Sequence, residues 1–276
     1  MRSSEETQTQ SPSVESKCVD ADGVSAKDIC VFLCEYASTL LGSGATCIRV
    51  ERNVGRMATA LGCKAVMTVL PRHIHLTVSR HGCADSYTYM CDTAHGPISF
   101  DVNTRLSRLS WAFADGEVDF KGVRERYAEI LRTPVAPPLW VLFAASCANG
   151  AFCRLFNGDM YAVGVVFLST LAGFCVRQLL CGRKIDIRLV VILCAFISSV
   201  LAAGAALFHI GDTPEIAVAT SVLYLVPGIP FLNSFSDLLS GNYICCYCRF
   251  AQAVILTCCL SVGLCCGLFL MNMGMF

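Results

Sequence analysis

The sequence predicts a small α+β domain followed by an all-α membrane domain of five transmembrane helices. The chain of 276 residues is 55% hydrophobic and only 15% charged, whereas soluble domains have about 25% charged residues. Charge is concentrated in residues 1–138, which hold 15 Lys and Arg and 16 Asp and Glu, against 6 and 5 in residues 139–276. Five long apolar segments fill that second part. These observations indicate one soluble domain and one membrane domain.

The soluble part begins with a polar segment. Residues 1–22 are rich in Ser, Thr, Gln and Glu and lack the apolar core of a signal peptide, so we expect a disordered tail. Residues 23–134 should form the α+β domain. Ser25 and Asp28 have capping-box spacing, apolar residues three and four apart indicate helices, and alternation in residues 73–78 indicates a half-buried strand. The expected elements are helices at 25–41, 46–61, 103–114 and 119–131 and strands at 65–70, 73–78 and 86–91.

The membrane domain should occupy residues 139–276. Pro134, Pro137 and Pro138 stop one helix and permit another to begin. A helix needs about 20 mostly apolar residues to cross a bilayer. The segments that qualify are 139–156, 160–180, 187–209, 216–235 and 250–273. The lipid bilayer is therefore the first expected partner.

The basic residues predict the orientation. Nine Lys and Arg lie near span ends on one side, whereas the other side has only Arg154. The nine are Lys121, Arg124, Arg126 and Arg132 before the first span, Arg177, Arg183, Lys184 and Arg188 around the loop between the second and third spans, and Arg249 before the fifth. By the positive-inside rule, we expect the soluble domain in the cytoplasm and Phe276 on the opposite side of the membrane. Cysteines of the soluble half should then be reduced thiols. Cys245, Cys246 and Cys248 are expected in the last cytoplasmic loop.

The fourth span contains Pro227-Gly228-Ile229-Pro230, which cannot sustain an unbroken helix. In a bilayer the freed backbone groups need protein or water as partners, and transporters bind solutes at such half-helix ends. A proline kink that merely suits packing is the alternative. The residues predicted to line the substrate path are Asn149, Pro227, Gly228, Pro230, Asn233 and Asp237. Asp237 is expected near the cytoplasmic end, with proton exchange or contact with an amino group as its task.

The residue patterns of enzymes and cofactor sites are missing from the sequence. It has no nucleophile elbow, phosphate loop or dinucleotide fingerprint, so we predict neither an enzyme nor a bound cofactor. His73 and His75 share a strand face, with Cys83, Cys91 and His95 close behind, but exposed strand faces often carry His and we predict no metal site. A net charge near zero, without a basic stripe, argues against a nucleic-acid partner.

Several motifs together resemble the threonine/serine exporter family, and some resemble its YjjP branch. They are residues 213–217, 225–230, Asn233, Asp237 and Gly241 in the membrane part, 44–46, 49–51 and 61–62 in the soluble part, and 120–123, 157–158 and 177–180 for the branch. The resemblance implies an inner-membrane exporter of small carboxylate solutes. It also implies a split exporter, in which this chain works with a second small membrane subunit of the YjjB kind. The cysteines at 245, 246 and 248 depart from the family pattern.

Some alternatives stay open. The branch implies a dicarboxylate such as succinate as the solute, and the wider family implies threonine or serine. A membrane-tethered sensor or interaction protein is the alternative of another class, although a tether needs no broken helix. A homo-oligomer is compatible with the sequence.

Overall fold

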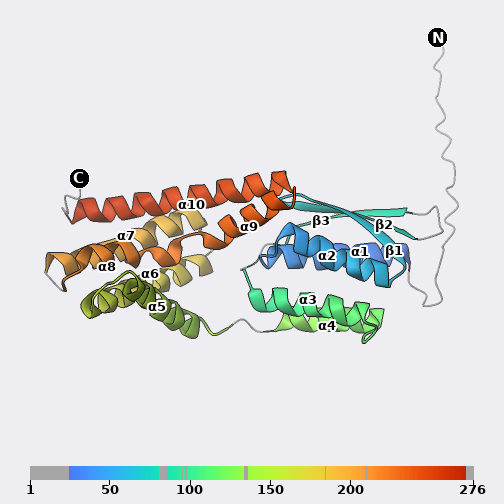
Figure 1. Cartoon of the computed structure of the whole chain (residues 1–276), viewed down its shortest axis with the longest axis horizontal. Coiled ribbons are helices and arrows are strands. Elements are labelled where there is room, and N and C mark those ends of the chain that lie inside the picture. Colours follow the sequence, from blue (N-terminus) through green and yellow to red (C-terminus); the bar gives the residue numbers. More distant parts are fainter. Residues whose placement is uncertain are drawn as a thin grey trace, which may run out of the picture. The chain divides into compact units, whose positions relative to one another are not determined.

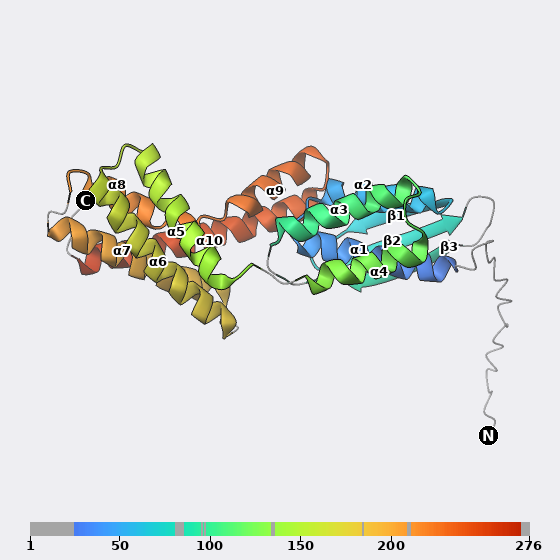
Figure 2. The same ribbon diagram turned by 90° about the horizontal axis from the view of Figure 1, so that it is seen from below.

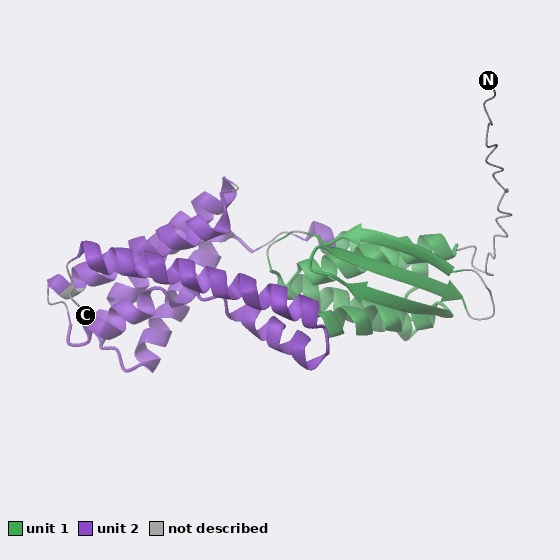
Figure 3. Ribbon diagram, turned by 90° about the horizontal axis from the view of Figure 1, so that it is seen from above, with its two compact units in different colours: residues 1–130 green, residues 131–276 purple. Residues whose placement is uncertain are grey.

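The chain forms two compact units, residues 1–130 and 131–276 (Figure 3). The structure is a computed structural model that describes residues 25–80, 86–94, 96, 98–133, 136–183, 185–208 and 211–271. The expected tail at residues 1–22 lies outside the described residues, as do Cys83, His95 and His209.

The first unit is a small α+β structure with a three-stranded antiparallel sheet, which confirms this part of the predicted fold class. Its elements are α1 (Ala26–Gly42), α2 (Cys47–Ala60), β1 (Cys63–Val69), β2 (His73–Arg80), β3 (Ser86–Asp92), α3 (Phe100–Ala114) and α4 (Phe120–Arg132). Ser25 is the N-cap of α1 as expected, and its side chain accepts a hydrogen bond from the Lys27 amide. Gly44, with φ +93°, permits the left-handed turn between α1 and α2.

The sheet has one buried and one exposed face. The order is β1-β2-β3, and Ile74, Leu76 and Val78 of β2 are fully buried under the helices. Burial of each such side chain stabilises the fold by roughly 1.5–3 kcal/mol. His73 and His75 alternate with them and lie on the exposed face, as the period of two predicts.

The helices of this unit form two further layers (Figure 1). α1 and α2 cover the buried face of the sheet, and α3 packs against α2. α4 packs on α1, where the rings of Phe120 and Tyr127 meet Phe32 edge-on at 5.5 and 5.6 Å between centroids. α2 and α3 lie side by side, and the pocket described below is formed between them.

The second unit is entirely helical in its described residues. It contains α5 (Pro138–Leu155), α6 (Met160–Gly182), α7 (Ile187–Leu207), α8 (Pro214–Ser221), the 3₁₀ turn η1 (Leu223–Leu225), α9 (Gly228–Leu239) and α10 (Tyr243–Leu270) (Figure 2). Four helices, α5, α6, α7 and α10, are long and apolar enough to cross a membrane, and α8–η1 with α9 forms a fifth span if this bent pair is counted as one. The chain is thus a multi-pass membrane protein.

The fourth span, expected over 216–235 with an interruption at residues 227–230, consists of two helices bent by 61° at residues 226–227, as the proline pair predicts. One expectation for this unit needs correction. The last helix begins at Tyr243 and not at residue 250, so Cys245, Cys246 and Cys248 lie in its first turns and not in a loop. Hydropathy locates only the apolar part of a helix. The more polar turns at residues 243–249 belong to the same helix, because the backbone hydrogen bonds of α10 begin there.

Small residues let the long helices approach closely. α10 packs against α7 along Gly263 and Gly267. A Cβ atom at Gly263 would overlap the carbonyl oxygen of Ile192, and one at Gly267 would overlap the Ser199 hydroxyl. This is the small-residue contact typical of membrane helices, which pack without a hydrophobic driving force between them.

Candidate functional site

The break in the fourth span is a complete helix end followed by a new helix start. η1 ends at Leu225, Val226 and Pro227 are not helical, and α9 begins at Gly228. Pro227 stands at the N-cap of α9 and Pro230 in its first turn, where a helix needs no N–H donor. The prolines are therefore accommodated by starting α9 and not by distorting a continuous helix.

A side chain of α5 donates a hydrogen bond to a backbone carbonyl oxygen just before the break. Asn149, near the middle of α5, is only 3% exposed, and its Nδ2 donates to the Thr220 carbonyl oxygen at 3.1 Å and to the Thr170 hydroxyl at 2.6 Å. Thr220 lies in the last turn of α8, where carbonyl oxygens lose their intrahelical partners. Asn149 thus adds a side-chain donor to a carbonyl oxygen that also accepts from the Val222 amide, and the structure places it at the end of α8 that precedes the break.

A second set of hydroxyl groups lies on the same side of the break. The Tyr224 hydroxyl of η1 and the Ser198 hydroxyl of α7 are 3.0 Å apart, and Ser198 donates to the Ser169 carbonyl oxygen of α6 at 3.2 Å. Gly173 makes room for them, because a Cβ atom there would overlap both hydroxyls. We define Asn149, Thr170, Ser198, Thr220 and Tyr224 as the break cluster. Of this set, only Asn149 was predicted from the sequence, and the signal for the others is a hydroxyl group near the middle of an apolar span.

The break also leaves a backbone donor at the start of α9. The Gly228 amide bonds to the Val226 carbonyl oxygen, Pro230 has no N–H, and Phe231 bonds to the Pro227 carbonyl oxygen. Within the described part of the chain, the remaining amide of this turn, that of Ile229, has no hydrogen-bond partner. A Cβ atom at Gly228 would meet nothing within 4 Å. The first turn of α9 therefore presents an amide and open space, and the positive end of a helix dipole attracts anions.

Asp237 belongs to a different polar group. Its carboxylate is completely buried and accepts a hydrogen bond from Nη1 of Arg249 at 2.8 Å, and the Arg249 side chain is 20% exposed. This ion pair joins α9 to α10 across the turn at Gly241. Ser234 reinforces the same contact by donating to the Cys246 carbonyl oxygen at 2.9 Å. Sequence reasoning missed the role of Arg249, although it is the only Lys or Arg in residues 211–276.

The predicted path residues are thus divided into two places. Asn149 lies with α6 and α8 before the break. Gly228 and Pro230 lie in the first turn of α9, with Pro227 as its N-cap. Asn233 is half-buried on α9, one turn before Asp237, and Asp237 is held by α10.

A third polar contact fixes the loops before α6 and α8. The Thr213 hydroxyl donates to Oδ1 of Asp159 at 2.6 Å, and the Asp159 amide donates to the Thr213 hydroxyl at 2.9 Å. The Asp159 carboxylate also caps α6 by accepting from the Ala162 amide. The hydrogen bond from the Thr213 hydroxyl is the main cause that lowers the pKa of Asp159 below its ordinary value of 3.8, and the backbone donors lower it further. Thr213 begins one of the motifs noted in the sequence, and its hydrogen bonds with Asp159 join the loop before α8 to the loop before α6.

The metal-site candidates do not come together in the described residues. His73 Nδ1 lies 2.8 Å from a carboxylate oxygen of Asp92 on the exposed sheet face. Cys91 points the other way and donates to the Cys34 carbonyl oxygen at 3.2 Å. No group of three or more His, Cys, Asp or Glu among the described residues could hold a metal ion.

Comparisons with known proteins all indicate similarity to transport proteins. The model of the family described as "Putative threonine/serine exporter" (ThrE) matches residues 30–271. A Klebsiella aerogenes protein named "Probable succinate transporter subunit YjjP" is 30% identical over 235 residues, which cover 83% of this chain and 88% of that protein. The protein of the same name from Escherichia coli K12 is 30% identical over 230 residues, which cover 81% and 87%. No solved structure matches the chain.

Proposed function

Because this chain belongs to the threonine/serine exporter family, we propose that it is one subunit of an inner-membrane exporter of small carboxylate solutes. Family membership confirms the resemblance seen in the sequence, including its YjjP branch, and identifies a membrane transporter and not an enzyme. The solute, the partner subunit, the membrane and the orientation are our proposals.

The broken fourth span is the observation that carries the proposal. It combines an open position at Gly228 and an amide donor at Ile229 with the hydroxyl and amide groups of the break cluster. Backbone of this kind persists in a membrane only where protein or a water-filled path surrounds it. An amide at the positive end of a helix suits the carboxylate of a solute. We therefore place the solute path beside the first turn of α9.

A dicarboxylate such as succinate is the solute that we favour. The two relatives are named as subunits of a probable succinate transporter. A charged Asp237 on its own would repel an anionic solute, but Arg249 compensates its negative charge. The family description favours threonine or serine as the second candidate.

A second small membrane subunit of the YjjB kind completes the proposal. The word "subunit" in the names of both relatives supports it. The nine-to-one distribution of basic residues supports an N-terminal unit in the cytoplasm and Phe276 outside.

Efflux from cells tests the solute. Cells that lack the chain should retain more succinate and release less into the medium, and expression of the chain with its partner should restore release. Threonine and serine are measured in the same samples. Restored release of threonine, with succinate unchanged, would transfer the assignment to amino acids; unchanged release of all three solutes would refute the exporter proposal.

A further inference from the structure

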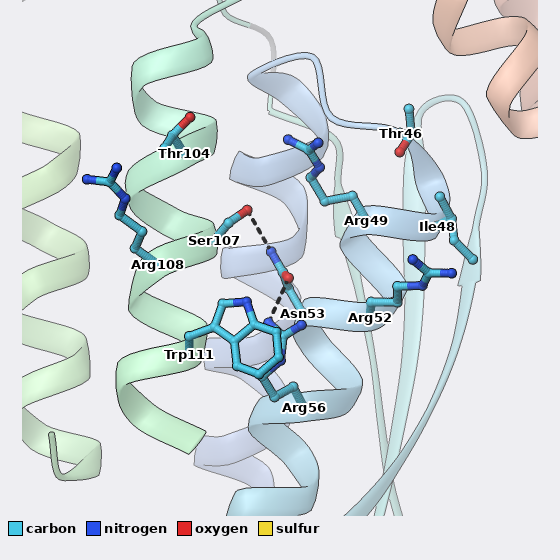
Figure 4. A pocket seen from close by; sticks show the side chains of 10 residues that line it. All are labelled: Thr46, Ile48, Arg49, Arg52, Asn53, Arg56, Thr104, Ser107, Arg108 and Trp111. Carbon is cyan, nitrogen blue, oxygen red and sulfur yellow. Dashed lines mark hydrogen bonds between the residues drawn. The ribbon is translucent and has the colours of Figure 1, made fainter. Parts of the chain in front are cut away.

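A pocket with a volume of about 490 Å³ lies between α2 and α3 of the first unit (Figure 4). Its lining includes four arginines, Arg49, Arg52 and Arg56 from α2 and Arg108 from α3, together with Trp111. No Asp or Glu is among the described residues that line it. The volume falls in the range of small-molecule sites.

The arginines of α2 are spaced to share one side of the helix. Arg49, Arg52 and Arg56 are three and four residues apart, so like charges are neighbours, which destabilises a helix. The unit as a whole is not basic, because residues 1–138 hold 15 basic and 16 acidic residues. The concentration of positive charge is therefore a local property of this pocket and calls for a ligand that compensates it.

Neutral groups hold the guanidinium group of Arg56 in place. Its Nη1 donates to Asn53 Oδ1 at 3.0 Å and to the Ser110 hydroxyl at 2.6 Å, and the guanidinium lies 3.6 Å from the centre of the Trp111 ring. Asn53 is fixed in turn by a hydrogen bond from its Nδ2 to the Ser107 hydroxyl at 3.1 Å. Figure 4 shows Arg49 and Arg56 on either side of this Asn53–Ser107 bond.

The other arginines also keep their charge uncompensated. Arg49 donates to the side-chain oxygen of Asn103 at 3.0 Å, again a neutral acceptor. No ion pair joins any of the four to a carboxylate within the part of the chain that the structure describes. Arg105, on the same helix as Arg108, does pair with Asp101 at 3.0 Å. Neutral partners therefore hold Arg49 and Arg56 in place, and all four arginines can offer their charge to an anion from outside the chain.

We propose that this pocket binds a small phosphate-bearing anion such as a nucleotide. Guanidinium groups match phosphate oxygens with paired, charge-assisted hydrogen bonds. Trp111 is 55% exposed with Arg56 stacked on its ring, so its exposed surface offers an aromatic contact for a base. The inference concerns binding by the first unit and does not depend on the exported solute.

Calorimetric titration of the purified full-length chain in detergent with ATP tests the proposal. We expect saturable binding that weakens as salt rises. Arg52→Gln and Arg108→Gln should each weaken it about tenfold, since a hydrogen bond to a charged group contributes roughly 1.5–3 kcal/mol. Both side chains lack an ion pair in the described structure, so neither change should lower the melting temperature. The matched control is Arg105→Gln, which removes the same charge outside the pocket.

The tryptophan reports where binding occurs. The chain has two tryptophans, so Trp140→Phe leaves Trp111 alone, and its fluorescence should follow the ATP titration. Absence of saturable binding, or equal weakening by Arg105→Gln, would overturn the proposal. Succinate that binds the pocket while ATP does not would assign it to a carboxylate and would overturn the phosphate assignment.

Discussion

At the residue scale, the buried pair of Asp237 and Arg249 decides how α9 is attached to the rest of the membrane unit. A carboxylate with no exposed surface stays charged only with a close partner, and Arg249 supplies it at 2.8 Å. The pair makes Asp237 first of all a structural residue. The sequence also predicts proton exchange or contact with an amino group as the task of Asp237, which would be a second role beside the structural one.

Removing one partner separates these two roles. Asp237→Asn leaves Arg249 uncompensated, so we expect a lower melting temperature, because breaking a buried pair costs about 3–5 kcal/mol. Asp237→Asn combined with Arg249→Gln should recover stability, as measured in detergent, but not the pH dependence of export. A double variant that exports with the wild-type pH profile would show that the pair is only structural.

Asn149 is the second decisive residue, because its side-chain donor joins α5 to the Thr170 hydroxyl of α6 and to the Thr220 carbonyl oxygen at the end of α8. Asn149→Ala removes that donor, and hydrogen bonds between membrane helices contribute about 1 kcal/mol. We expect a slightly lower melting temperature and a much larger loss of export. The control is Cys147→Ala on the exposed side of α5, which should change neither. Wild-type export by Asn149→Ala would remove this residue from the path.

At the element scale, the sequence predicted most helices and strands but not how the last two helices meet. Periodicity and capping located all seven elements of the first unit within a few residues, because half-buried elements repeat their apolar side chains regularly. The proline pair predicted the break. The partner of Asp237 and the members of the break cluster other than Asn149 were missed, because these contacts join residues far apart in sequence. The spacing within one helix does not reveal which helices are neighbours.

The break gives a prediction that distinguishes obstruction from misfolding. Gly228→Leu adds a side chain whose Cβ atom would meet no atom within 4 Å beyond the adjoining residues and the helix's own backbone, so it should leave the melting temperature unchanged and still block export. Gly173→Ala is the contrasting change, because its Cβ atom would overlap the hydroxyls of Tyr224 and Ser198 and should lower stability. If Gly228→Leu exports at the wild-type rate, the break is a packing feature and the path lies elsewhere.

At the scale of the whole molecule, the proposed orientation puts both the arginine pocket and the N-terminal unit in the cytoplasm. A reporter that is active only outside the cytoplasmic membrane should be active when fused after Phe276. The same reporter inserted between Arg183 and Arg188 should be silent, since this basic segment is expected inside. The reverse pattern would overturn the orientation, and with it the access of cytoplasmic nucleotides to the pocket.

The central claim is that this chain, with a second membrane subunit, moves a small carboxylate past the break in its fourth span. The most direct measurement is the flux of labelled succinate across vesicles that contain the purified chain with its partner, the chain alone, or the pair carrying Gly228→Leu. We predict rapid flux only for the wild-type pair, with all three samples inserted in equal amounts. Equal flux from the chain alone would contradict the need for a partner, and equal flux from the Gly228→Leu pair would contradict the path.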